Sequence, residues 1–120
     1  MERSVFFRIF EGEDLAEAIK KRAEESEVKA GVFFIIGSLK EAVLGYLKEG
    51  KYHYVQMNGP LEIASCMGNI AVDEQGEIAI HAHLVVSDEQ CKAFGGHLAN
   101  GSHVSATAEL VVIEGVGVNL

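Results

Sequence analysis

The stretch from Glu77 to Val86, EIAIHAHLVV, constrains the fold of this chain most, because apolar residues occupy every second position in it. Successive side chains of an extended strand leave opposite faces. One set of apolar positions shares a face and predicts a surface turned toward a core: Ile78, Ile80, Ala82, Leu84 and Val86. His81 and His83 leave the other face together. The sequence therefore predicts a strand that is half buried and presents two imidazoles side by side.

The first third of the chain predicts two strands joined by a helix. Residues 4–10 alternate sufficiently for a first strand. Residues 30–36 form a continuous apolar run that ends at Gly37-Ser38, which is typical of a strand buried on both faces. Asp14 opens a helical stretch to about Glu25, with a narrow apolar stripe made of Leu15, Ala18, Ile19 and Ala23. Parallel pairing of these two strands through the helix would be a right-handed crossover.

The rest of the chain predicts antiparallel hairpins. The glycine in Lys48-Glu49-Gly50 favours a hairpin turn. Asn58-Gly59-Pro60 predicts a second turn, because proline cannot donate to a strand ladder, so the next strand should begin at Leu61. The strands expected from Leu39 onward cover residues 42–47, 52–57, 61–72, 77–86 and 103–113. The predicted fold is one α+β domain over residues 1–120, with about seven mostly antiparallel strands in a curved sheet and one or two helices.

Length and composition agree with a single domain. A chain of 120 residues, 48% hydrophobic, is long enough for one core and too short for two. No apolar run reaches the length of a membrane span, and the first residues do not resemble a secretory signal. We therefore expect a cytoplasmic protein with no membrane partner, in which Cys66 and Cys91 remain reduced thiols.

Charge is unevenly divided between the two halves of the chain. Residues 1–60 contain ten acidic and nine basic residues, whereas residues 61–120 contain eight acidic residues and a single basic one, Lys92. A surface that binds duplex DNA needs clustered Lys and Arg to displace counterions from phosphates. The one dense basic cluster, Lys20-Lys21-Arg22, lies among several glutamates. Direct nucleic-acid binding is therefore disfavoured, while cation binding is permitted.

Histidines are the main candidates for chemistry. Three neutral imidazoles can hold zinc and leave a fourth position open, and a pair at i, i+2 on a rigid strand plus a third ligand from nearby is sufficient. The third ligand would be His97, fourteen residues after His83 and directly after Gly95-Gly96. The alternative is that the strand histidines make ordinary hydrogen bonds. Cys91 could supply a thiolate or simply be packed, and His53 and His103 are expected at the surface.

Several short motifs together resemble a known family. They are Gly12-Glu13-Asp14 after the early Arg8, Gly37-Ser38-Leu39, Gly59-Pro60-Leu61-Glu62-Ile63, Gly68-Asn69, His81-Ala82-His83, Gly95-Gly96-His97-Leu98, and the strand from Val104 to Ile113. The whole chain thereby resembles the prokaryotic branch of the PPC (plants and prokaryotes conserved) domain. The resemblance implies a compact α+β domain that assembles as a homotrimer. It also implies a fold similar to that of acetolactate decarboxylase, which binds zinc through three histidines, and it groups His97 with His81 and His83.

The family also carries a DNA-binding label. In the plant members an Arg-Gly-Arg-Pro hook outside the PPC domain contacts AT-rich minor grooves. This chain has no such hook, its only proline is Pro60, and its acidic second half would repel phosphate. The resemblance therefore implies the domain and its assembly, and leaves DNA binding as a minority hypothesis.

Charged and polar residues within apolar strands are further candidates. Glu62, which matches the family motif, could be a fourth metal ligand, an acceptor for a ligating histidine or a general base, or a strand carboxylate at a subunit contact. Arg8 and Glu109 lie inside apolar strands, and Arg8 is expected to neutralise one of these glutamates within or between subunits. Gly37-Ser38 could present backbone N–H groups to a ligand or simply end a strand.

Three hypotheses of function follow, and the first is favoured. The first is a zinc-binding module whose trimer encloses sites for an unidentified small-molecule ligand, with the metal held by His81, His83 and His97. The second is a zinc-dependent enzyme with decarboxylase-like chemistry on a hydroxy-keto acid, in which Glu62 or Glu109 moves a proton. The third is a DNA-associated regulator that acts through its oligomer. No phosphate-binding glycine loop or dinucleotide fingerprint is visible.

Overall fold

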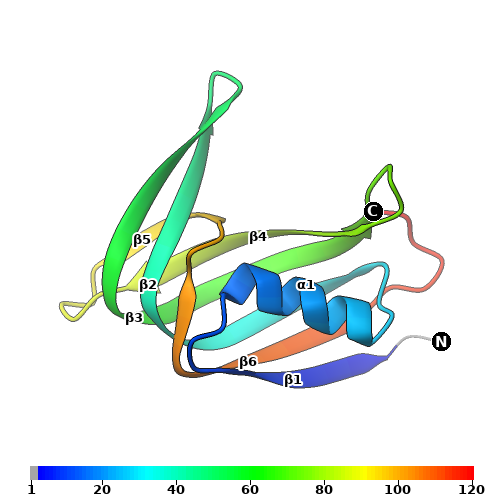
Figure 1. Cartoon of the computed structure of the whole chain (residues 1–120), viewed down its shortest axis with the longest axis horizontal. Helices are drawn as coiled ribbons and strands as arrows, with labels where there is room; N and C mark the ends of the chain where they lie inside the picture. The colour runs from blue at the N-terminus through cyan, green and yellow to red at the C-terminus, as the bar shows by residue number, and fades with distance from the viewer. Residues whose placement is uncertain (1–2) are drawn as a thin grey trace.

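Six strands and one helix make up the fold, in a computed structural model that describes residues 3–120 (Figure 1). In chain order they are β1 (Ser4–Phe10), α1 (Leu15–Glu25), β2 (Gly31–Lys48), β3 (Lys51–Val72), β4 (Ile78–Ser87), β5 (Ala93–Leu98) and β6 (His103–Glu114). The α+β class is confirmed, with one helix and six strands in place of about seven. Among the described residues, no helix is long and apolar enough to cross a membrane.

The strands form one antiparallel sheet in the order β1-β6-β2-β3-β4-β5. The last strand returns to β2, where Leu98 and His97 pair with Leu44 and Gly45, so that β2, β3, β4 and β5 close into a small barrel. This closure places three segments of the chain side by side, those around Gly45, Tyr54 and His97. It also gives Leu44 and Gly45 of β2 a neighbouring strand on both sides.

The strands at residues 4–10 and 30–36 do not pair with each other in parallel. The C-terminal strand β6 lies between β1 and β2 and is antiparallel to both. β1 therefore forms the edge of the sheet and pairs with β6 alone, whereas β2 pairs with β6 on one side and with β3 on the other. Local alternation indicates that a strand exists, but it carries no information about which distant strand is inserted beside it.

Two predicted turns are wrong, because the strands continue through them. β2 runs through Gly37-Ser38, and β3 runs through Asn58-Gly59-Pro60. The ladder between them changes register between Leu39 and Glu41, where Lys40 faces the Gly59-Pro60 pair. A bulge of this kind leaves a residue outside the ladder, so proline can occupy it without losing a backbone hydrogen bond. The expected strands therefore merge in pairs, whereas β5, which was not counted, is a true strand.

The helix prediction is confirmed. α1 begins after Asp14, whose carboxylate accepts a hydrogen bond from the Glu17 N–H, as an N-cap residue does. The four predicted stripe residues are its buried positions, and the helix packs against β4, β1 and β6 (Figure 1). The largest fully buried side chains of the core beneath it include Ile9, Phe33, Leu39, Ile70, Leu84 and Leu110. One face of the sheet is thus the core, and the other is turned outward.

An ion pair fixes α1 to the start of the chain. The Arg22 guanidinium donates to both carboxylate oxygens of Glu13, at 2.7 and 2.8 Å, and its Nη2 also donates to the Arg8 carbonyl. The same Glu13 carboxylate accepts from the Phe10 N–H at 2.8 Å. The hydrogen bonds from Arg22 are the largest cause that lowers the pKa of Glu13 from 4.5 to about 2.

We expect Glu13→Gln to lower the free energy of unfolding at pH 7 by about 2 kcal/mol, with water screening part of the pair because the Glu13 side chain is 30% exposed. A carboxyl with a depressed folded pKa stabilises the fold above its unfolded pKa of 4.5, and this contribution disappears as the pH falls toward 2. Urea unfolding between pH 7 and pH 3 should show the wild-type advantage shrinking over that interval. Glu24→Gln, at an exposed position of the same helix, is the control and should change little.

Candidate metal centre

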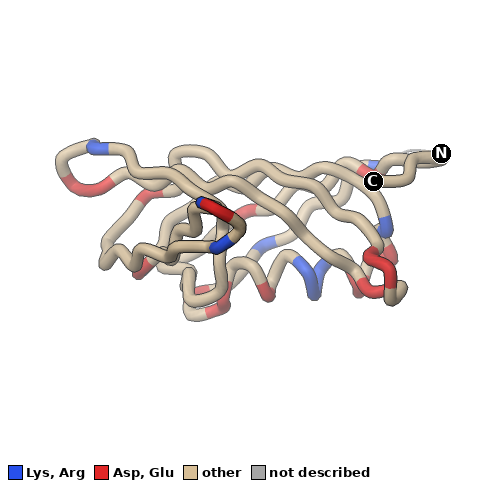
Figure 2. Tube along the Cα trace, turned by 90° about the horizontal axis from the view of Figure 1, so that it is seen from above, with Lys and Arg blue, Asp and Glu red and all other residues tan. Residues whose placement is uncertain are grey.

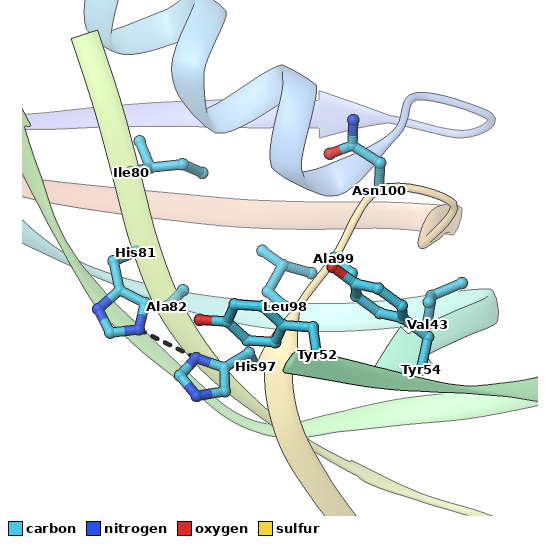
Figure 3. Close-up of a pocket in the computed structure, with 10 residues that line it drawn as sticks. All are labelled: Val43, Tyr52, Tyr54, Ile80, His81, Ala82, His97, Leu98, Ala99 and Asn100. Atoms are coloured by element: carbon cyan, nitrogen blue, oxygen red, sulfur yellow. Dashed lines mark hydrogen bonds between the residues drawn. The ribbon is translucent and has the colours of Figure 1, made fainter. Parts of the chain in front are cut away.

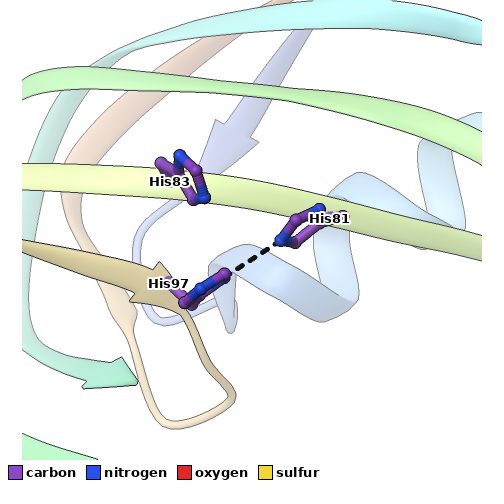
Figure 4. Close-up of side chains that lie close together, drawn as sticks. All are labelled: His81, His83 and His97. Carbon is purple, nitrogen blue, oxygen red and sulfur yellow. Dashed lines mark hydrogen bonds between the residues drawn. The ribbon is translucent and has the colours of Figure 1, made fainter. Parts of the chain in front are cut away.

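Three histidines meet on the outer face of the barrel. His81 and His83 project from β4 on the face opposite the buried Ala82 and Leu84, as the alternation predicts. His97 projects from β5 and is the direct partner of His83 in the β4–β5 ladder. Directly opposed residues of an antiparallel pair point to the same side of the sheet. Strand pairing therefore brings together two side chains that are fourteen residues apart in the sequence (Figure 4).

The imidazole nitrogens lie within coordination range of one another. One nitrogen from each of the three rings can be chosen so that all lie within 4.8 Å of one another. His81 Nε2 and His97 Nδ1 are 3.0 Å apart (Figure 4). The His81 and His97 rings are stacked with centroids 5.0 Å apart, and the His83 ring turns its plane across both. The three rings thus converge on one point.

A glycine permits the close approach of β5 to β2. A Cβ atom built on Gly96 would lie 2.8 Å from the Gly45 carbonyl oxygen and 3.1 Å from the Leu44 Cβ. Any side chain at this position would push β5 away from β2, and the adjacent His97 would move with it. Of the two glycines before His97, Gly96 is therefore the one that permits the barrel to close.

The protonation equilibrium of His97 favours metal ligation. Partial loss of hydration lowers the pKa of His97 below its ordinary value, and the neighbouring His83 and His81 lower it further. A positive charge on one protonated imidazole disfavours protonation of the neighbouring ring. Since only the neutral imidazole offers a lone pair to a metal, the lowered pKa keeps His97 in its ligating form near neutral pH.

The donor set fits zinc. Imidazole nitrogens bound 2.0–2.1 Å from a tetrahedral zinc ion lie about 3.3 Å apart. The 3.0 Å contact between His81 Nε2 and His97 Nδ1 is already close to that spacing, and the ligand atoms of all three rings lie within 4.8 Å of one another. Three neutral nitrogen ligands are typical of catalytic or ligand-binding zinc sites, which keep a fourth position open. The residues present could therefore hold a divalent metal with room for one further ligand.

The other residues singled out from the sequence are not part of this cluster. Glu62 is exposed on β3 and faces Ser87, four residues along β4 from His83, so it lies about 13 Å along the strand from the cluster. Arg8 and Glu109 are direct partners on β1 and β6, and both are exposed. Ser38 donates its hydroxyl to the Ser105 carbonyl at 2.7 Å. Within one chain, these residues serve strand pairing or line the outer face of the sheet.

The remaining cysteines and histidines also lie elsewhere. Cys66 is buried, and burial raises the pKa of its thiol to about 12. Cys91 is exposed in the turn between β4 and β5, at the end of the hairpin away from His83 and His97. His53 is exposed, as predicted, whereas the half-buried His103 pairs with the Glu41 carboxylate at 2.7 Å. The three-histidine cluster therefore contains no thiolate.

A cleft opens beside the cluster, and sequence reasoning missed its aromatic wall. The cleft has a volume of about 590 Å³ and is lined by Val43, Tyr52, Tyr54, Ile80, His81, Ala82, His97, Leu98, Ala99 and Asn100 (Figure 3). Tyr52 approaches His97 edge-on, with ring centroids 5.4 Å apart. The signal was present in Tyr52-His53-Tyr54, because alternation on a strand places both tyrosines on one face. Nothing local indicated that this face would turn toward the histidines.

Comparison with known proteins identifies the family. The sequence profile of the Plants and Prokaryotes Conserved (PCC) domain, the PPC domain named above, matches residues 1–116. The chain belongs to the PPC family. A crystal structure of a PPC protein from Pyrococcus horikoshii is 32% identical, with a TM-score of 0.90, and the match covers 98% of this chain and 82% of that one. The resemblance proposed from the motifs is therefore confirmed.

Two further matches of this PPC chain bear on function and context. The crystal structure of AF0104 from Archaeoglobus fulgidus, described as a metal-containing protein, is 27% identical with a TM-score of 0.83, over 93% of this chain and 79% of that one. The bifunctional protein GlmU from Synechococcus sp. (strain JA-2-3B'a(2-13)) is 32% identical over 108 residues, or 89% of this chain. The PPC chain spans only 16% of the length of that relative. The likeness to GlmU therefore concerns one segment of a longer protein.

Proposed function

We propose that this PPC domain binds zinc through His81, His83 and His97 and uses the open position to hold a small-molecule ligand. The observation that carries the proposal is the convergence of three imidazoles, with ligand atoms within 4.8 Å of one another, at the edge of a cleft. The description of the Archaeoglobus relative as metal-containing supports it. Zinc bound in this way supplies a Lewis acid that attracts carboxylate, hydroxyl or carbonyl oxygens.

We also propose that the domain works as a homotrimer, as the family resemblance implies. Support comes from a row of directly paired residues that crosses the outer face of the sheet: Phe6, Val111, Phe34, Met67, His83 and His97. Phe6 is 73% exposed and Met67 is 54% exposed, which is unusual for large apolar side chains. The apolar surface and the histidines thus share one face, so a trimer that buries this surface would bring a neighbouring subunit close to the metal.

The other two hypotheses gain less support from the structure. Decarboxylase-like chemistry needs a carboxylate within reach of the metal, but none of the residues lining the cleft is a carboxylate, and Glu62 and Glu109 lie elsewhere on the outer face. DNA binding needs a cationic surface. Figure 2 shows acidic and basic residues mixed along α1 and at the loops, with largely uncharged strands between them.

Metal content tests the proposal directly. We expect tag-free protein dialysed against buffer with zinc, and then against buffer without it, to retain about one zinc per chain by plasma mass spectrometry. Replacement with cobalt(II) should give the intense visible bands of a four-coordinate site, because the open position is filled by water. The family assignment does not depend on this result, because it rests on the match of the sequence. A chain that retains no zinc and no cobalt would contradict the proposal.

A further inference from the structure

The cleft beside the histidines has a wall built from two tyrosines. Tyr52 and Tyr54 project from the same face of β3, and their rings are nearly parallel, with a 19° angle between planes and centroids 6.0 Å apart. Tyr52 and Tyr54 are 45% and 61% exposed, so both rings offer free faces and edges. The wall begins at His97, which touches Tyr52 edge-on (Figure 3).

Gly45 provides the space that these rings occupy. It lies opposite Tyr54 in the β2–β3 ladder and opposite His97 in the β2–β5 ladder. A Cβ atom built on Gly45 would lie 3.2 Å from Tyr54 Cε1 and 3.4 Å from Tyr52 Cδ1. Because Gly45 has no side chain, the rings lie down over β2 toward the metal centre and cover its backbone. Strand register thus places both tyrosines on the face where Gly45 leaves space for their rings.

The charge of the cleft indicates what the ligand must carry. Apart from the two histidines, every lining residue is neutral, and none of these described residues has a carboxylate. A divalent metal on three neutral imidazoles would therefore retain most of its charge. An anionic oxygen ligand compensates this charge, and a neighbouring hydroxyl or keto oxygen could complete a chelate.

The size and lining of the cleft indicate what else the ligand carries. A volume of about 590 Å³ exceeds the needs of a two- or three-carbon acid and is within the usual range for small-molecule pockets. Val43, Leu98 and Ala99 extend the apolar surface beyond the tyrosines. The one amide, Asn100, lies at the far side from the histidines, where its Nδ2 donates to Glu17 (Figure 3). The middle of the cleft is therefore suited to a flat apolar ring.

We propose that the ligand is an aromatic 2-hydroxy or 2-keto carboxylate, with its oxygens on the metal and its ring against Tyr52 and Tyr54. The proposal rests on the proposed metal site and specifies the class of compound that this site selects. Aromatic side chains prefer offset or edge-to-face contacts with a second ring, and such contacts add to the gain from burying its area. A compound with the same chelating head and no ring would lose this part of the affinity.

Lactate and mandelate test the proposal, because they share one 2-hydroxy-carboxylate head and differ in the phenyl ring. Each would be titrated into cobalt(II)-loaded protein while the visible absorption of the metal is recorded. We expect mandelate to bind about tenfold more tightly than lactate to the wild type. The preference should fall to about twofold or less in the Tyr52→Ala/Tyr54→Ala variant, with lactate affinity nearly unchanged. Tyr46→Ala is the matched control, because Tyr46 lies on the same hairpin and does not line this cleft.

The outcomes separate this inference from the metal site beneath it. Protein that takes up no cobalt overturns both proposals together. Protein that shows the cobalt bands but binds lactate and mandelate equally overturns only the aromatic ligand, and the metal site stands. A mandelate preference that survives in the double tyrosine variant also overturns the assignment of the wall.

Discussion

His81→Ala/His83→Ala protein is expected to lose bound zinc almost completely, with an affinity at least 100-fold below that of the wild type. The double substitution removes two of three ligands and leaves His97 alone, which cannot hold the ion against water. Both imidazoles project from the outward face of β4, where His81 and His83 are exposed. Their removal creates no cavity in the core. The thermal midpoint of the metal-free protein should therefore change by only a few degrees.

The matched control is His53→Ala, which removes an exposed histidine of β3 that is not part of the three-histidine cluster. It should retain about one zinc per chain in the same dialysis experiment. Circular dichroism on all three proteins shows whether the fold is kept. If the double variant retained wild-type zinc, the metal would be bound somewhere other than at His81, His83 and His97.

The sequence predicted best where the structure depends on local periodicity. α1 and its buried stripe follow from a 3.6-residue pattern and the Asp14 cap, and the facing of β4 follows from strict alternation. The predictions were wrong where residues typical of turns lie inside strands, because the tertiary structure accommodates them there. From local sequence alone, Gly59-Pro60 indicates a turn. In the fold it occupies a bulge of a strand twenty-two residues long. A pattern of neighbours in sequence does not distinguish a turn from a bulge.

The candidate site was predictable only in part, for the same reason. The pair at positions 81 and 83 is a property of one strand, whereas the position of His97 depends on the register of β4 with β5. Tyr52 and Tyr54 were missed because their approach to His97 depends on barrel closure through β2, a contact between segments about fifty residues apart. Glu62 is on the predicted face, but the distance along the ladder separates it from the histidines.

Ile36→Glu is expected to convert the proposed trimer into a monomer. Ile36 is 67% exposed on the outer face of β2 and lies directly opposite Glu109 of β6. In an isolated subunit the new carboxylate is hydrated and costs at most about 1 kcal/mol of stability. In a trimer that buries this face, two adjacent carboxylates would have to lose their water, which costs several kcal/mol at each interface. Light scattering after size-exclusion chromatography should therefore show a threefold lower mass at micromolar concentration.

Val72→Glu is the matched control, because Val72 is 42% exposed near the end of β3, outside the row of paired outer-face residues. It introduces the same charge without entering the proposed interface, so the trimer should persist. The experiment also distinguishes the assembly from the metal site. A monomeric Ile36→Glu protein that keeps its zinc would place all three ligands in one subunit, as the geometry of β4 and β5 requires. An Ile36→Glu protein that remains a trimer would show that subunits associate through another surface, and the exposed hairpin bearing Tyr46 and Leu47 would be the next to test.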